Sequence, residues 1–79
     1  MSKAKDIYSK LARANYGDAK WVYEMVLYVL RSEDPNVRQM NMRQLRTRLS
    51  WSVNRKHITI KEAKEYYKAV TGVRWYERH

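Results

Sequence analysis

The sequence predicts an all-α protein: one compact domain over residues 1–79, built of about four helices in an orthogonal or irregular bundle. Only two glycines and one proline interrupt the chain, and the alternation of β-branched residues that is typical of strands is scarce. Apolar residues instead recur at helical spacing between capping residues. A chain of this length forms a single domain, and without cysteine it has no disulfide to stabilise it.

The first helix is predicted from Lys3 to Asn15, with Ser2 as its N-cap. Its apolar stripe consists of Ala4, Ile7, Leu11 and Ala14. We expect Tyr16-Gly17 to end this helix, with Gly17 in the left-handed conformation of a C′ residue.

The second helix is predicted from Ala19 to Arg31, capped by Asp18. It is apolar almost all round, so we expect it to be the central helix, packed by the others over most of its circumference. Leu27 falls within its narrow polar strip. Two interpretations of Leu27 stay open, a single exposed leucine or a contact with a partner, for example in a homodimer through this region.

The third helix carries the basic residues. Asp34 and Pro35 predict a short turn from Pro35 to Met40, after which the main helix restarts at Met42, because Asn41 and Gln44 have capping-box spacing. The alternative is one long helix from Pro35. The apolar pattern favours the break, since Val37 and Met40 do not extend the core-facing stripe, which consists of Met42, Leu45, Leu49, Ser52 and Val53.

A capping box of Thr59 and Glu62 predicts the fourth helix, which runs to about Thr71 before Gly72 in the C′ position. Its predicted inner face consists of Ile60, Ala63, Tyr66, Tyr67 and Val70. We expect the aromatic residues of the C-terminal tail, 73–79, to fold back onto the core.

Positive charge is concentrated in one part of the chain. Seven of the nine net charges lie between Pro35 and Lys61, a stretch without any acidic residue. Residues 1–34 hold six basic and five acidic side chains, and residues 62–79 hold four and three. Such a concentration is repulsive unless an anionic partner compensates it, so the sequence points to a polyanion.

On a helical wheel, the face of the third helix opposite its apolar stripe combines guanidinium, amide and hydroxyl groups with one indole. Arginine pairs with phosphate, asparagine and glutamine pair with adenine, and an indole stacks on a base. We therefore predict phosphate contacts from the basic residues and base contacts or stacking from Gln44, Trp51 and Asn54. The full predicted site is Arg43, Gln44, Arg46, Thr47, Arg48, Trp51, Asn54, Arg55, Lys56 and Lys61.

Two alternatives accompany this site. Trp51 is either exposed or tucked against the first helix or the tail, and Arg48 and Arg55 have the spacing to stack on its indole. The segment from Trp51 to Lys56 also resembles the Trp-x-x-Asn-Arg core of a homeodomain recognition helix, which would make Asn54 the adenine reader. This resemblance covers six residues, and the preceding segments lack the homeodomain pattern, so we treat it as a chance match.

Several function classes are disfavoured. The two histidines have no paired carboxylates near them, and no metal-ligand spacing or glycine-rich phosphate loop occurs, so we expect no catalytic residue, cofactor or metal. No apolar run spans a bilayer, and we expect a soluble, cytoplasmic protein without a membrane partner. The leading hypothesis is a regulatory, non-catalytic protein that binds DNA or RNA. The alternative is an adaptor or inhibitor that docks its basic face on an acidic protein surface.

Overall fold

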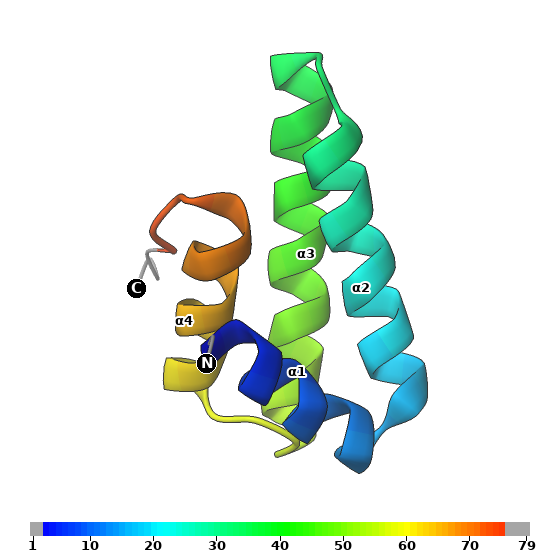
Figure 1. Ribbon diagram of the computed structural model, residues 1–79, viewed down its shortest axis with the longest axis vertical. Helices are drawn as coiled ribbons and strands as arrows, with labels where there is room; N and C mark the ends of the chain where they lie inside the picture. The colour runs from blue at the N-terminus through cyan, green and yellow to red at the C-terminus, as the bar shows by residue number, and fades with distance from the viewer. Residues whose placement is uncertain (1–2, 76–79) are drawn as a thin grey trace.

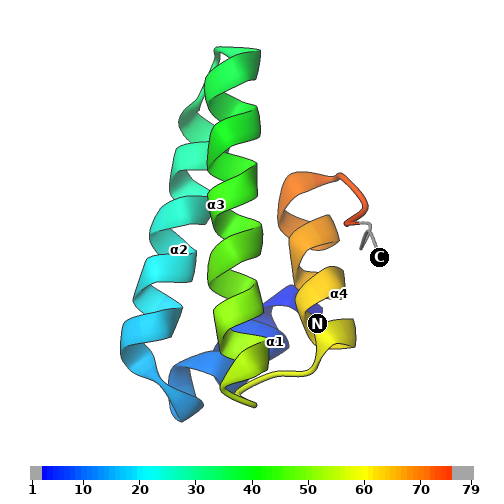
Figure 2. The same cartoon turned by 180° about the vertical axis from the view of Figure 1, so that it is seen from behind.

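The computed structural model describes residues 3–75 and confirms an all-α domain. Its helices are α1 (Lys3–Ala14), α2 (Tyr16–Arg31), α3 (Pro35–Asn54) and α4 (Ile60–Thr71). α2 and α3 form an antiparallel hairpin, and α1 and α4 pack against the end of this hairpin that is remote from its connecting loop (Figure 1). Seen from behind, α3 covers α1, so the outer side of α3 forms much of that face of the molecule (Figure 2).

The core lies where the four helices meet. The predicted stripe of α3 is confirmed, because Met42, Leu45, Leu49 and Ser52 are buried and Val53 packs against the core. The other buried side chains are Ile7 and Leu11 from α1, Ala19, Val22, Met25, Val26 and Val29 from α2, Ile58 from the α3–α4 loop, and Ala63, Tyr66 and Tyr67 from α4. Burial raises the pKa of Tyr66 to about 12, because it disfavours the charged phenolate.

The junction between α1 and α2 differs from the prediction. Asn15, and not Asp18, caps α2, because the Asn15 side chain accepts a hydrogen bond from the backbone N–H of Asp18 at 3.1 Å. Gly17 therefore lies inside the first turn of α2 and does not terminate α1. The predicted N-cap Ser2 lies outside the described residues. Capping by Asn15 leaves the carboxylate of Asp18 available for the contacts with α3 described below.

The predicted break in the third helix is wrong, and the alternative of one long helix from Pro35 holds. Asp34 caps it by accepting from the backbone N–H of Asn36 at 2.8 Å, while the Asn41 side chain donates to Ser32 Oγ at 3.0 Å across the hairpin. The apolar stripe ends at Met42 because the preceding turns project beyond α1 and α4 (Figure 1). The end of the stripe therefore marks where α3 leaves the core.

The sequence predicted that the other helices would enclose α2 over most of its circumference, and this prediction is wrong. The helix packs against α1, α3 and α4, yet Trp21, Tyr23, Tyr28 and Leu30 remain exposed. Indole and phenol rings tolerate this position because their polar edges can face water. Leu27, expected within an exposed strip, is half-buried.

The fourth helix is formed as predicted. Thr59 Oγ1 accepts from the backbone N–H of Glu62 at 3.1 Å, Glu62 Oε1 accepts from that of Thr59 at 2.9 Å, and Gly72 is left-handed with φ 73°. One detail is wrong: Ile60 is exposed, and Ile58, which precedes the cap, takes the buried position instead. An apolar residue before the cap is the usual arrangement for fixing the angle at which the chain enters a helix.

Glu62 also joins α4 to α1. Its Oε1 atom accepts from Lys10 Nζ at 2.8 Å in addition to the Thr59 backbone. These hydrogen bonds, first that from Lys10 and then that from the Thr59 backbone, hold the pKa of Glu62 below its ordinary value of 4.5. Ionised Glu62 therefore stabilises the folded state at pH values above 4.5, and this stabilisation is lost as the pH falls through the lowered pKa.

We predict that Glu62→Gln lowers the free energy of unfolding by about 1 kcal/mol near neutral pH. The deficit should shrink as the pH falls below 4.5, because the wild-type carboxylate then protonates as well. Urea unfolding from pH 7 to pH 3 measures both effects. Glu33→Gln, in the exposed hairpin loop, is the control for charge alone. An equal and pH-independent deficit in both variants would contradict the prediction.

Candidate functional site

The structure places all the predicted site residues at the surface. Two of them, Arg46 and Arg48, are half-buried, and the other eight are exposed. The exposed members are Arg43, Gln44, Thr47, Trp51, Asn54, Arg55, Lys56 and Lys61. The predicted site residues as a whole do not form one continuous patch. The side chains of Arg48 and Arg55 extend toward α2, whereas that of Arg46 extends toward α4.

On the α2 side, one guanidinium group is held between two indoles. The Arg48 Cζ atom lies 4.5 Å from the ring centroid of Trp21 on α2 and 4.5 Å from that of Trp51 on α3. We call these three side chains the Trp–Arg–Trp stack. Trp51 is 43% exposed and Trp21 is 48% exposed, so the rings hold Arg48 without being enclosed themselves. The predicted stacking of Arg48 on Trp51 is thus present, and the structure adds Trp21 from α2.

The geometry of the stack leaves Arg48 able to bind. Ring contacts occupy the two flat faces of a guanidinium group, whereas its N–H groups point outward in its plane. The described hydrogen bonds and ion pairs of Arg48 include no carboxylate. The stack therefore orients a charged donor at a surface with two exposed aromatic rings.

Arg55 is different, because an acid from another helix neutralises it. Its Nη1 atom lies 3.2 Å from Asp18 Oδ2, and its Cζ atom lies 5.7 Å from the Trp51 ring centroid. His57 Nδ1 lies 3.3 Å from the same carboxylate oxygen. The stretch from Pro35 to Lys61 contains no acidic residue, but the fold brings Asp18 to Arg55, so the main contact of Arg55 is structural.

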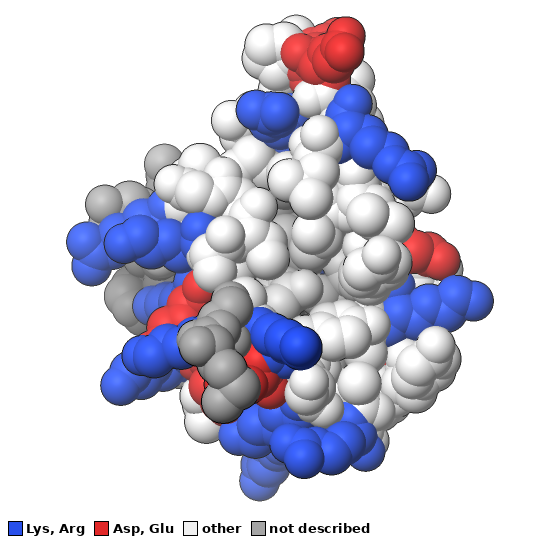
Figure 3. Space-filling view, in the orientation of Figure 1, with Lys and Arg blue, Asp and Glu red and all other residues white. Residues whose placement is uncertain are grey.

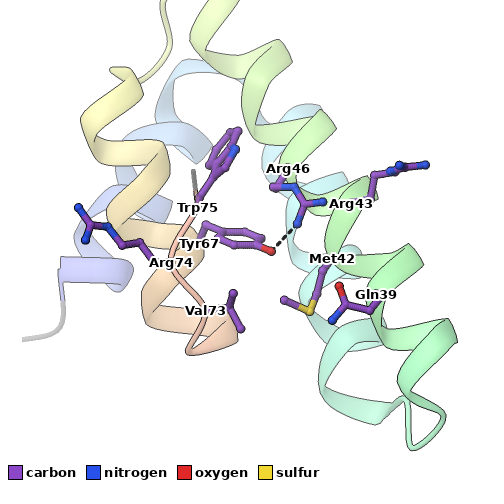
Figure 4. Close-up of a pocket in the computed structure, with 8 residues that line it drawn as sticks. All are labelled: Gln39, Met42, Arg43, Arg46, Tyr67, Val73, Arg74 and Trp75. Atoms are coloured by element: carbon purple, nitrogen blue, oxygen red, sulfur yellow. Dashed lines mark hydrogen bonds between the residues drawn. The ribbon is translucent and has the colours of Figure 1, made fainter. Parts of the chain in front are cut away.

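On the α4 side, a cavity of about 560 Å³ separates α3 from α4 and from residues 73–75 (Figure 4). We call it the α3–α4 cleft. Arg46 reaches toward α4 and donates from Nη1 to Tyr67 Oη at 2.6 Å, whereas Arg43 points toward solvent. No carboxylate is among the described lining residues, which are Gln39, Met42, Arg43, Arg46, Tyr67, Val73, Arg74 and Trp75.

The two lysines of the predicted site flank the loop after α3. Lys56 follows the C-cap of α3 in the left-handed conformation, with φ 63°, and its backbone N–H donates to the Val53 carbonyl at 2.9 Å. Lys61 lies exposed in the first turn of α4. Both lysines add positive charge near this end of α3.

No family model, curated protein or solved structure matches this chain. Within residues 3–75, no three histidine or acidic side chains gather closely enough to hold a metal ion. None of the four described helices combines the length and apolarity needed to cross a bilayer.

Four residues beside the arginines were not among the predicted site residues: Trp21 in the Trp–Arg–Trp stack, and Gln39, Tyr67 and Trp75 in the α3–α4 cleft. Each contributes through a tertiary contact with an arginine or by closing the cleft. One signal was available for Trp21: in an antiparallel hairpin with a short loop, the N-terminal end of α2 must lie beside the C-terminal end of α3, where Trp51 is found.

We predict that Arg48→Lys lowers the free energy of unfolding by about 1 kcal/mol, because a compact ammonium group cannot lie flat between two rings. Arg43→Lys, the same change on the same helix without a ring contact, should be neutral within about 0.5 kcal/mol. Denaturant unfolding monitored by circular dichroism measures both values. Equal effects of the two substitutions would show that the stack contributes no specific stability.

Proposed function

We propose that the protein binds nucleic acid through the outer surface of α3, in a regulatory and non-catalytic role. The observation that carries the proposal is the pairing of exposed charge with exposed aromatic surface. Arg43 and Arg48 have no carboxylate partner among the described ion pairs, and Arg48 is held beside the half-exposed ring of Trp51.

The chemistry of this surface divides into two parts. Arg43 and Arg48, with Lys56 and Lys61 near the end of the helix, supply cations for phosphate groups. Indole rings offer a face on which a base can stack, and stacking contributes about 1–3 kcal/mol per base. Exposed amides of Gln44 and Asn54 are suited to base edges. These groups bind and orient, and none of them needs to exchange a proton or form a bond.

A charge-reversal experiment tests this function. We predict that Arg43→Glu combined with Arg48→Glu weakens binding of a fluorescently labelled oligonucleotide at least about tenfold and reduces the slope of log affinity against log salt by about 1–2. Fluorescence anisotropy over a salt series, with DNA and RNA in single-stranded and double-stranded forms, measures both quantities.

The matched control is Lys5→Glu combined with Arg13→Glu, because both residues are exposed on α1 and the change in net charge is identical. The control should retain most of the affinity and of the salt slope. If both double variants lose affinity equally, binding reflects net charge alone and not the α3 surface. If the wild-type protein binds none of the probes in a salt-dependent way, the proposal is wrong.

A second candidate function is docking on an acidic protein surface, as an adaptor or inhibitor. One observation favours it: the loop end of the α2–α3 hairpin exposes apolar side chains, with Leu30 62% and Met40 55% exposed and Val37 also exposed. In Figure 3 a broad uncharged surface covers this hairpin, with basic and acidic side chains around its rim. Apolar surface of this kind is typical of a protein partner and contributes little to phosphate binding.

The two candidates predict different responses to substitution. If the protein is an adaptor, a stoichiometric protein partner should survive nuclease treatment and be lost with Leu30→Gln combined with Met40→Gln. Oligonucleotide affinity should not change in that variant if α3 binds nucleic acid as proposed. Affinity purification with and without nuclease, followed by anisotropy on the same variant, distinguishes them. A partner released by nuclease would contradict the adaptor function.

A further inference from the structure

We propose that the α3–α4 cleft binds a nucleoside phosphate, either as a free nucleotide or as a nucleotide unit of a nucleic-acid chain. This cleft lies on the side of α3 away from the Trp–Arg–Trp stack. Arg43 is shared with the outer surface of α3, but the other residues of the cleft are not part of the function proposed above, so the two proposals can fail separately.

The size and walls of the cleft suit a small ligand. Its volume of about 560 Å³ falls within the range of small-molecule sites, about 300–1,000 Å³. Three separate segments form it, namely α3, α4 and the C-terminal residues 73–75 (Figure 4). A site assembled from three segments is held by the fold and is not a chance depression on one helix.

One part of the cleft is built for an oxyanion. Arg46 is half-buried, and its hydrogen bond to Tyr67 Oη, on a ring that is itself 1% exposed, fixes the direction of the guanidinium group. This bond uses one of the five N–H groups of Arg46, so donors remain for a ligand. Because Tyr67 Oη accepts from Arg46, its own hydroxyl proton is also free to be donated.

Arg43 provides the second cation. It lies three residues before Arg46, so the two side chains leave α3 on adjoining positions of one face. Arg43 is exposed and points toward solvent (Figure 4), and its long side chain has the freedom to turn toward an anion at Arg46. Two neighbouring guanidinium groups without a lining carboxylate repel each other, and a phosphate group removes this repulsion.

The other part of the cleft is apolar and aromatic. Trp75 is half-buried with its ring centroid 5.7 Å from that of Tyr67, and Met42 and Val73 complete this wall. Indole and apolar side chains provide the surface on which a base packs, and the amide of Gln39 at the same cavity can pair with a base edge. Figure 4 shows the Arg74 side chain directed away from the cleft, so the proposal does not use it.

Simpler ligands match only part of these walls. Inorganic phosphate would pair with the arginines and leave the aromatic wall without a contact. An uncharged apolar ligand would desolvate Arg46 without compensating its charge, which is costly. A ligand with a phosphate at one end and a planar ring at the other satisfies both parts.

Titration by nuclear magnetic resonance tests the proposal on the whole chain, with the indole N–H signals of Trp21, Trp51 and Trp75 as separate reporters. The probes are the four common nucleoside 5′-monophosphates, the matching nucleosides, inorganic phosphate and a single-stranded oligonucleotide. We expect at least one monophosphate to shift the Trp75 signal saturably, with an affinity at least about tenfold greater than that of its nucleoside or of phosphate.

Variants locate the binding. Arg43→Gln should weaken the monophosphate about tenfold, and Gln39→Ala should weaken it less and change the preference among bases. Arg38→Gln, the same substitution on an exposed residue of α3 that does not line the cleft, should have no effect. All three positions are exposed, so these variants should fold. Equal weakening by Arg43→Gln and Arg38→Gln would overturn the proposal.

The reporters also separate the two sources of ligand and the two functions. A Trp75 shift produced by the oligonucleotide and by no monophosphate supports the cleft as the site of a nucleotide unit in a chain. A Trp75 shift by a monophosphate, with no polymer bound, supports the cleft and contradicts the function proposed for α3. If the oligonucleotide shifts the Trp21 and Trp51 signals and no probe shifts the Trp75 signal, the function proposed for α3 is supported and the cleft proposal is overturned.

Discussion

Burial of one side of α3 is the constraint on which the rest of the surface depends. Met42, Leu45 and Leu49 are at most 3% exposed, and they fix the rotation of the helix about its axis. Because successive side chains on a helix are separated by roughly 100°, this rotation decides where each arginine points. Arg48 falls beside α2 and its Trp21, Arg46 falls beside α4 and its Tyr67, and Arg43 lies between them. A different rotation would bury the guanidinium groups or scatter them.

The placement of acidic side chains complements this arrangement. Asp18 pairs with Arg55 where α2 and α3 adjoin, and Glu62 pairs with Lys10 where α4 meets α1. Each of these pairs joins two helices, so the carboxylates stabilise the fold at its helix junctions. The middle of α3 receives no such partner from the described residues, and its positive charge stays available to an anion. The charge concentration seen in the sequence therefore persists in the fold at Arg43, Arg46 and Arg48, although Arg55 is withdrawn from it.

Local signals in the sequence predicted most of the fold, and tertiary contacts account for what they missed. The capping box of Thr59 with Glu62 and the left-handed Gly72 were predictable because all their hydrogen bonds lie within a few residues. The stripe of α3 was predictable from its period alone. Asn15 was missed because two acceptable caps stand three residues apart, and only packing chooses between them. The continuity of α3 was missed because an apolar stripe ends both where a helix breaks and where it leaves the core, as it does before Met42. Within the candidate site, the arginines followed from composition, but Trp21, Tyr67 and Trp75 come from other segments and needed the fold.

The central claim is that guanidinium groups in the middle of α3 contact a polyanion. Chemical modification of arginine with phenylglyoxal, followed by mass spectrometry with and without a bound oligonucleotide, tests it most directly. The account predicts that the oligonucleotide slows modification of Arg43 and Arg48 severalfold and leaves exposed Arg13 on α1 unchanged. Equal protection of all three arginines, or protection of none, would contradict it.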